Sequence, residues 1–175
     1  EISNCTTYAG MLLDGLNNVV ISGNTVKNTE RKGNQGANSS NVVIENNYIT
    51  NANESRRPDE GAISIYPDVS NTRIVNNTLV GNYQGFTVRS KVGMVAPDVH
   101  VNFNNIYGNE DFGVGNFAQN GGILDATNNW WGSSTGPCRE LPNGKWVGKG
   151  DKVSANVAFV PWLPHPIEFW HYLPR

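Results

Sequence analysis

An asparagine-centred segment recurs along the chain, and this repeat is the feature that most constrains the fold. Its six asparagines are separated by 20, 23, 30, 27 and 25 residues: Asn4, Asn24, Asn47, Asn77, Asn104 and Asn129. Repeats of about 20–50 residues are typical of solenoids, in which each turn buries its apolar side only against neighbouring turns. We therefore predict a stack of turns, with the asparagines forming a hydrogen-bonded ladder at one corner.

Apolar residues keep fixed distances from these asparagines. They stand five before (Val19, Val42, Thr72, Val99, Leu124), three before (Ile21, Ile44, Ile74, Val101, Ala126) and two after (Val26, Ile49, Leu79, Ile106, Trp131). Positions two apart on a strand share one face, so the first two sets are predicted to point inward. The residues between them are mixed in polarity, which indicates a solvated outer face: Val20, Val43, Arg73, His100 and Asp125.

A second strand begins at a glycine in most repeats. Aligning Gly61, Gly85 and Gly113 predicts that Ile63 and Ile65 point outward. The repeat around Asn47 lacks a clear strand near Gly36, so a wide loop is expected there.

These patterns predict an all-β fold, a right-handed parallel β-helix of about six coils. The coils occupy residues 1–137, and residues 138–175 form an irregular C-terminal cap with an aromatic tail. Because Asn4 already lies in a repeat, we expect the chain to begin inside a coil, with further coils or a self-associating edge on that side.

The six repeats resemble the pectate-lyase-like right-handed β-helix superfamily, in particular NosD-like and carbohydrate-binding or sugar-hydrolase β-helix proteins. The run Asn-Asn-Trp-Trp-Gly at residues 128–132 is similar to the ending of surface β-helix proteins. The resemblance implies an end cap at this run, and carbohydrate as the class of ligand.

Composition excludes several other classes of function. The net charge is −2 without a basic cluster, which argues against nucleic-acid binding, and no apolar stretch approaches the length of a membrane span. Cys5 and Cys138 lie at opposite ends of the predicted stack and are expected to be separate thiols. The histidines and cysteines are scattered, so no zinc or copper site is predicted.

A few charged residues form a candidate catalytic group. Polyuronate lyases and epimerases need a cation that neutralises the substrate carboxylate and a base that removes the α-proton. The weak candidates for these roles are Arg89, Lys91, Asp59 and Asp111. Asp59, Glu110 and Asp111 are candidates for binding Ca²⁺ as a cofactor. The alternative is that these are ordinary corner and solubility residues.

Aromatic residues provide a different route to function, because exposed rings stack on sugars. Trp130, Trp146 and Tyr83, together with Arg89, are the candidate carbohydrate-binding residues, whereas Trp131 falls in an inward column. The aromatic tail is expected to fold across the last coil.

Three functions remain open at the level of sequence. The favoured one is an extracellular or cell-surface module that binds polysaccharide without catalysis. The alternatives are a fragment of a polyuronate lyase or epimerase, and a structural scaffold or surface-layer module.

Overall fold

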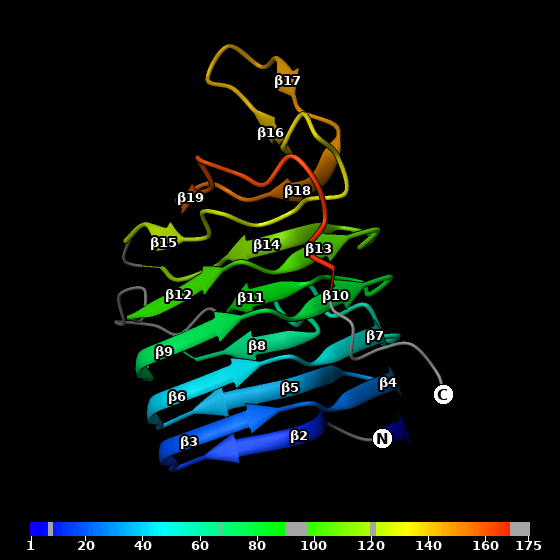
Figure 1. The fold of residues 1–175 in the computed structure, drawn as a ribbon, viewed down its shortest axis with the longest axis vertical. Coiled ribbons are helices and arrows are strands. Elements are labelled where there is room, and N and C mark those ends of the chain that lie inside the picture. Colours follow the sequence, from blue (N-terminus) through cyan, green and yellow to red (C-terminus); the bar gives the residue numbers. More distant parts are fainter. Residues whose placement is uncertain (7–8, 67, 90–97, 120–121, 169–175) are drawn as a thin grey trace.

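The protein is a stack of β-strand turns along one long axis (Figure 1). The computed structural model describes residues 1–6, 9–66, 68–89, 98–119 and 122–168. The described part contains strands, turns and no helix, and so none that could span a membrane.

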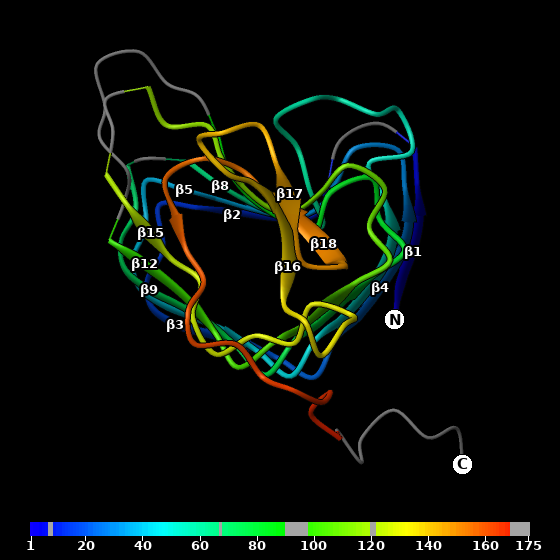
Figure 2. The ribbon, with the colours of Figure 1, turned by 90° about the horizontal axis from the view of Figure 1, so that it is seen from above.

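Three sheets form the sides of the stack and enclose the core (Figure 2). Sheet A contains, in spatial order, β1 (Ile2–Cys5), β4 (Thr25–Thr29), β7 (Tyr48–Ala52), β10 (Thr78–Val80) and β13 (Asn105–Tyr107). Sheet B contains β2 (Ala9–Asp14), β5 (Lys32–Ala37), β8 (Ile63–Ile65), β11 (Phe86–Val88), β14 (Phe112–Asn116), β18 (Gly150–Val153), β16 (Pro137–Glu140) and β17 (Trp146–Val147). Sheet C contains β3 (Asn17–Ser22), β6 (Ser40–Glu45), β9 (Ser70–Val75), β12 (Val99–Asn102), β15 (Leu124–Asp125) and β19 (Val157–Ala158).

The predicted solenoid is confirmed, but the number of complete turns is smaller than about six. Four turns supply a strand to all three sheets: β2–β3–β4, β5–β6–β7, β8–β9–β10 and β11–β12–β13. The next turn replaces its third strand with an isolated bridge between Asn105 and Trp130. The number of coils predicted from the sequence was higher because each repeated asparagine was taken to mark one complete coil.

The inward columns are buried as predicted. Ile44, Ile74 and Val101 have no exposed surface, and neither do Ile49 and Leu79 across the core. Their parallel register, with Ile44 opposite Ile74 and Ile74 opposite Val101, stacks like residues one turn apart. Trp131, also fully buried, belongs to this core as expected.

An asparagine ladder holds the corner between sheets C and A. Each member donates its side-chain N–H to the side-chain oxygen of the next, over 2.9–3.0 Å. The ladder consists of Asn24, Asn47, Asn77, Asn104 and Asn129.

Asn4, which the sequence placed in this ladder, lies elsewhere. It belongs to β1, whose pairing with β4 places it level with Asn28, and the Asn28 side chain donates to it over 3.2 Å. Asn28 in turn accepts from Asn51, so these three asparagines form a separate outer row. The short first interval of 20 residues reflects this difference, because Asn4 marks a strand and not the corner before it.

Two expectations about sheet B were wrong. Ile63, not Ala62, pairs with Phe86, so Ile63 and Ile65 are buried in the core and Ser64 instead faces Thr87 on the outside, 3.0 Å away. The Gly61 N–H donates to the Ser64 hydroxyl, which makes a turn and starts the strand one residue later. A one-residue shift exchanges the two faces of a strand.

The wide loop is also at a different place from the one expected. Lys32–Ala37 is a regular, wholly buried strand, β5. The long connection lies instead between β7 and β8, at residues 53–62, and projects beyond the stack (Figure 2).

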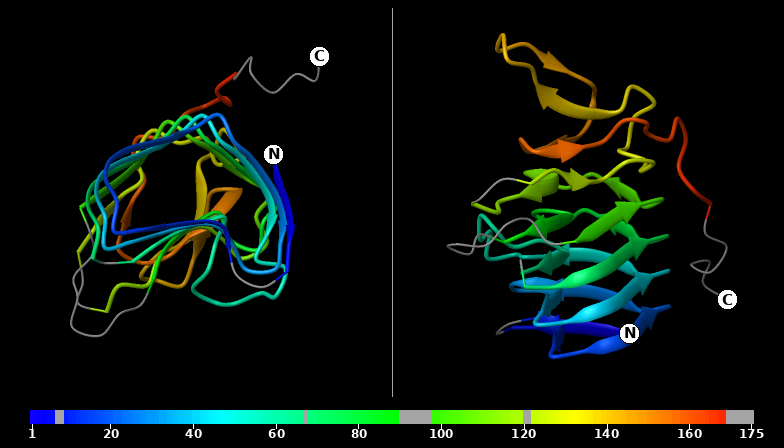
Figure 3. Two further views of the ribbon diagram at one scale, coloured as in Figure 1. Left: turned by 90° about the horizontal axis from the view of Figure 1, so that it is seen from below. Right: turned by 90° about the vertical axis from the view of Figure 1, so that its left-hand side faces the viewer.

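The C-terminal segment adds a hairpin and a strap. The antiparallel hairpin of β16 and β17 stands above the last turn, and β18 returns to pair with β14 (Figures 1 and 3). The chain then descends along sheet A, where the side chain of Asn105 exchanges two hydrogen bonds with the backbone of Ile167. Cys5 and Cys138 are both free, as predicted.

Candidate functional site

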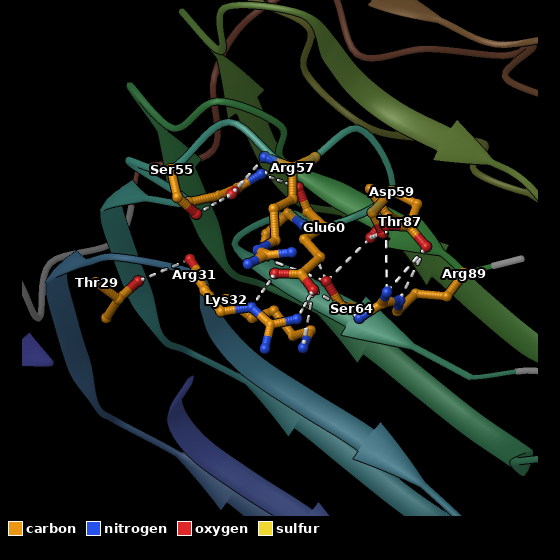
Figure 4. A network of polar contacts seen from close by, with 12 residues as sticks. Thr29, Arg31, Lys32, Ser55, Arg57, Asp59, Glu60, Ser64, Thr87 and Arg89 are labelled. Carbon is orange, nitrogen blue, oxygen red and sulfur yellow. Dashed lines mark hydrogen bonds and ion pairs between the residues drawn. The ribbon is translucent and has the colours of Figure 1, made fainter. Parts of the chain in front are cut away.

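The outer face of sheet B carries a buried group of charges centred on Glu60 (Figure 4). Glu60 sits in the 53–62 loop and has no exposed surface. Its carboxylate accepts from both Arg31 and Arg89, the latter over 2.8 Å, and lies 3.2 Å from the Lys32 ammonium. We call these five residues, Asp59 included, the Glu60 cluster.

The cluster keeps the Glu60 carboxylate ionised. Burial by itself would raise the pKa of Glu60, but the hydrogen bond from Arg31 and the positive charges of Lys32 and Arg89 outweigh burial and lower it. Burial also lowers the pKa of Lys32, partly offset by Glu60. Because these charges are removed from water, they hold the loop in one position on the sheet.

Arg89 is fully engaged within the cluster. Its Nε and one terminal nitrogen donate to Asp59 over 3.1 and 3.2 Å, and its other terminal nitrogen donates to Glu60. The guanidinium also lies 5.0 Å from the centre of the Tyr66 ring. Asp59 and Arg89 thus meet, as the catalytic hypothesis requires, but in an ion pair that occupies the arginine donors. Lys91, the other candidate, lies outside the described residues.

The remaining acidic candidates have different partners. Asp111 accepts from Lys152 over 2.9 Å and from Gln84 over 3.2 Å. Glu110 pairs with Arg56 over 2.8 Å, in an exposed position. In the parts of the chain that the structure describes, no group of three or more His, Cys, Asp or Glu residues is placed to hold a metal ion. The structure therefore does not gather Asp59, Glu110 and Asp111 around one point.

A groove of about 410 Å³ opens above the cluster, at the C-terminal end of sheet B. Trp146, half exposed on the hairpin, and Phe112 of β14 both line it. Lys152 lies 4.0 Å from the centre of the Phe112 ring. The rest of the lining comes from Arg139, Glu140 and residues 153–155. The groove thus combines aromatic faces with polar groups at its edge.

The other aromatic candidates lie away from this groove. Tyr83 lines a separate hollow of about 420 Å³ beside the 53–62 loop, with Arg56 6.0 Å from the centre of its ring. Trp130 is half-buried and continues sheet A, because it forms a parallel bridge with Asn105 of β13. Of the four candidate carbohydrate-binding residues, only Trp146 lines the groove.

Sequence reasoning missed Phe112, Arg139 and Lys152 as members of one site. Phe112 and Lys152 become neighbours because β18 returns to pair with β14 after the hairpin. The repeat ends before that return, so no spacing in the sequence indicates it.

A family model described as "right handed beta helix region" matches residues 1–106. This is well over half of the chain. The chain belongs to the right-handed β-helix family. No curated protein and no solved structure matched it.

The match covers the regular part of this β-helix. It ends within β13, the last strand of the fourth complete turn. The Glu60 cluster lies inside the matched region, whereas Trp146 and Lys152 lie beyond it. All the residues that line the groove, Phe112 included, therefore lie C-terminal to the matched region.

Proposed function

We propose that this β-helix is an extracellular or cell-surface module that binds polysaccharide in the groove beside Trp146 without cleaving it. The proposal includes a relationship to pectate-lyase-like and NosD-like proteins. It also includes a role for the Asn-Asn-Trp-Trp-Gly run as the motif that ends the β-helix. The observation that carries the proposal is the pairing of two aromatic rings with charged side chains in one open groove.

Sugar rings present an apolar face and a polar edge. Trp146 and Phe112 offer flat apolar surfaces, and Lys152, Arg139 and Glu140 offer hydrogen-bonding groups nearby. Asp111, which is partly exposed, continues this polar surface toward the 53–62 loop. The buried Gln84 links Asp111 to the loop, because it donates both to Asp111 and to the backbone of Pro58. The arrangement supports an extended ligand running along the axis of the stack.

The hydrogen bonds of Arg89 to Asp59 and Glu60 argue against its use as the base of a lyase, and so favour binding without catalysis. An arginine acting as base needs a nitrogen that faces the substrate, whereas the guanidinium nitrogens of Arg89 face Asp59 and Glu60. Removing Arg89 from these partners would leave Glu60 buried with fewer counter-charges.

Replacing Trp146 with alanine tests the proposal. We expect at least a tenfold loss of retention on the polysaccharide that binds the natural chain, in pull-downs on cellulose, xylan, mannan, pectin and alginate. Val147→Ala is the matched control, because it removes a partly exposed apolar side chain from the same strand. Equal retention of the two variants would contradict a role for the groove.

A parallel assay separates binding from catalysis. Ultraviolet absorbance of an unsaturated uronate product, formed from pectin or alginate with added Ca²⁺, would overturn the non-catalytic proposal in favour of a lyase. Absence of retention on every polysaccharide would favour the scaffold.

A further inference from the structure

Phe103 occupies a backbone conformation that is unfavourable for its residue type. It immediately precedes the ladder residue Asn104 and has φ of 56°. In the other turns the same position holds Gly23, Asn46, Asn76 and Asn128, all with positive φ. Glycine and asparagine tolerate the left-handed region, whereas a bulky aromatic residue rarely adopts it.

Hydrogen bonds fix the place of Phe103 in this row. Its N–H donates to the Asn128 carbonyl over 3.0 Å, and its carbonyl accepts from the Asn76 N–H over 2.9 Å. The corner geometry is thus the same as in the neighbouring turns, and only the side chain differs. Phe103 is 46% exposed, so a large part of its side chain is open to solvent.

The residues that occupy the position of Phe103 in the adjacent turns are uncharged and polar. Asn76 lies one turn away on one side, and its side-chain amide makes no hydrogen bond to another described residue. Asn128 lies on the other side, about 4.8 Å away in the direction of stacking. An exposed flat ring beside a free amide presents one apolar face and one hydrogen-bonding group.

We propose that Phe103 and Asn76 form a second carbohydrate site, which takes a neutral pentose or hexose unit. The choice of ligand class rests on the proposed function, and the site itself rests on the strained, exposed ring. Residues kept in unfavourable backbone conformations are characteristic of functional positions. The absence of charge from the row, which consists of Gly23, Asn46, Asn76, Phe103 and Asn128, favours a neutral sugar over an ionic ligand.

The two sites face different directions. Phe103 lies in the corner between β12 and β13, where sheets C and A meet, and Figure 2 shows this corner opposite sheet B. One sugar chain in the groove and one at the corner would be held on opposite sides of the stack. The module would then bridge two polysaccharide chains.

Phe103→Asn tests the site with two independent readouts. We expect the melting temperature to rise by about 2 °C, since asparagine relieves the backbone strain at this position. We also expect the loss of one binding site. A residue retained only for structure would lower the melting temperature when it is replaced.

Equilibrium dialysis with cellohexaose, xylohexaose and mannohexaose measures the number of sites. We expect saturation at two oligosaccharides per natural chain, and at one for Phe103→Asn or Trp146→Ala. Phe103→Tyr keeps the ring and should retain two. Tyr107→Asn removes another partly exposed aromatic residue, one without positive φ, and should also retain two.

The outcomes distinguish the two proposals. Unchanged stoichiometry in Phe103→Asn, or a loss of both stability and binding, overturns the corner site and leaves the groove intact. Unchanged stoichiometry in Trp146→Ala overturns the groove alone. No binding of any of the three oligosaccharides by the natural chain overturns the corner site.

Discussion

Single asparagines stabilise this β-helix through hydrogen bonds that reach three turns. Asn77 donates its side-chain N–H groups to the carbonyls of Ile44 and Val75 and to the side chain of Asn104. Its side-chain oxygen accepts from the backbone and the side chain of Asn47. All of this occurs without solvent, because Asn77 has no exposed surface.

Asn77→Ala is therefore expected to destabilise the fold by roughly 3 kcal/mol, since it leaves several buried polar groups unpaired. Urea unfolding monitored by circular dichroism measures the loss. Asn24→Ala at the end of the ladder is the matched control, because Asn24 is only partly buried and its side-chain oxygen has no ladder donor. Similar losses in the two variants would argue against stabilisation by stacking.

At the scale of elements, the 53–62 loop differs most from the regular turns. It is held from within by Asn53, which donates to the carbonyls of Arg57 and Glu60, and from below by the Glu60 cluster. The loop covers the outward side chains of Ser64 and Thr87, which are fully buried for this reason. The loop therefore borders the outer face of sheet B on the side away from the groove.

Glu60→Gln should release this loop. Removing the carboxylate leaves Asp59 as the remaining carboxylate of the Glu60 cluster beside three positive charges, and we expect a loss of about 3 kcal/mol in unfolding free energy. Trypsin cleavage between Arg56 and Arg57, both exposed, should accelerate in the native state.

Glu110→Gln serves as the control for this prediction. It removes only the exposed pair with Arg56, so the expected change is below about 0.5 kcal/mol. A cleavage rate in Glu60→Gln equal to that of the control would mean that Asn53 alone holds the loop.

Across the whole molecule, a second ladder connects β18 to the turns. Asn82 donates to Asn109, and Asn109 donates to Asp151 of β18 over 2.7 Å. The carboxylate also accepts from the backbone N–H groups of Gly108 and Asn109. Burial nevertheless dominates over these hydrogen bonds and raises the pKa of Asp151.

The direction of this shift fixes its effect on stability. The folded carboxyl holds its proton more tightly than the unfolded one, so its contribution is complete below the unfolded pKa and is lost as pH rises through the folded pKa. Glu60 and Asp125 have lowered pKa values and act in the opposite direction, losing their contributions as pH falls.

Asp151→Asn should remove the cost of ionising this group. We expect a melting temperature at neutral pH equal to or above that of the natural chain, with an advantage that shrinks toward acidic pH. Thermal unfolding of both chains across the acidic to neutral range gives the comparison. A variant less stable at every pH would mean that the three hydrogen bonds to the carboxylate outweigh its burial.

The sequence by itself determined the fold class, the inward columns and the corner that carries the asparagine ladder. These follow from residue type at fixed spacing, because each turn must place apolar residues over those of the next. Phe103 is an aromatic residue at a position that is Gly or Asn in the neighbouring turns. Its left-handed backbone and its exposure, which suggest a function, are known only from the structure.

Tertiary structure decided what the repeat does not encode. The register of β8, the place of the wide loop and the position of Asn4 depend on irregular connections, whose length and path are set by contacts formed only in the stack. The Glu60 cluster joins residues 29 positions apart, and the groove joins Phe112 to Lys152 through the return of β18. Such sites form where non-repeating segments come close together in space. The spacing of residues along the chain does not indicate which of these segments will meet.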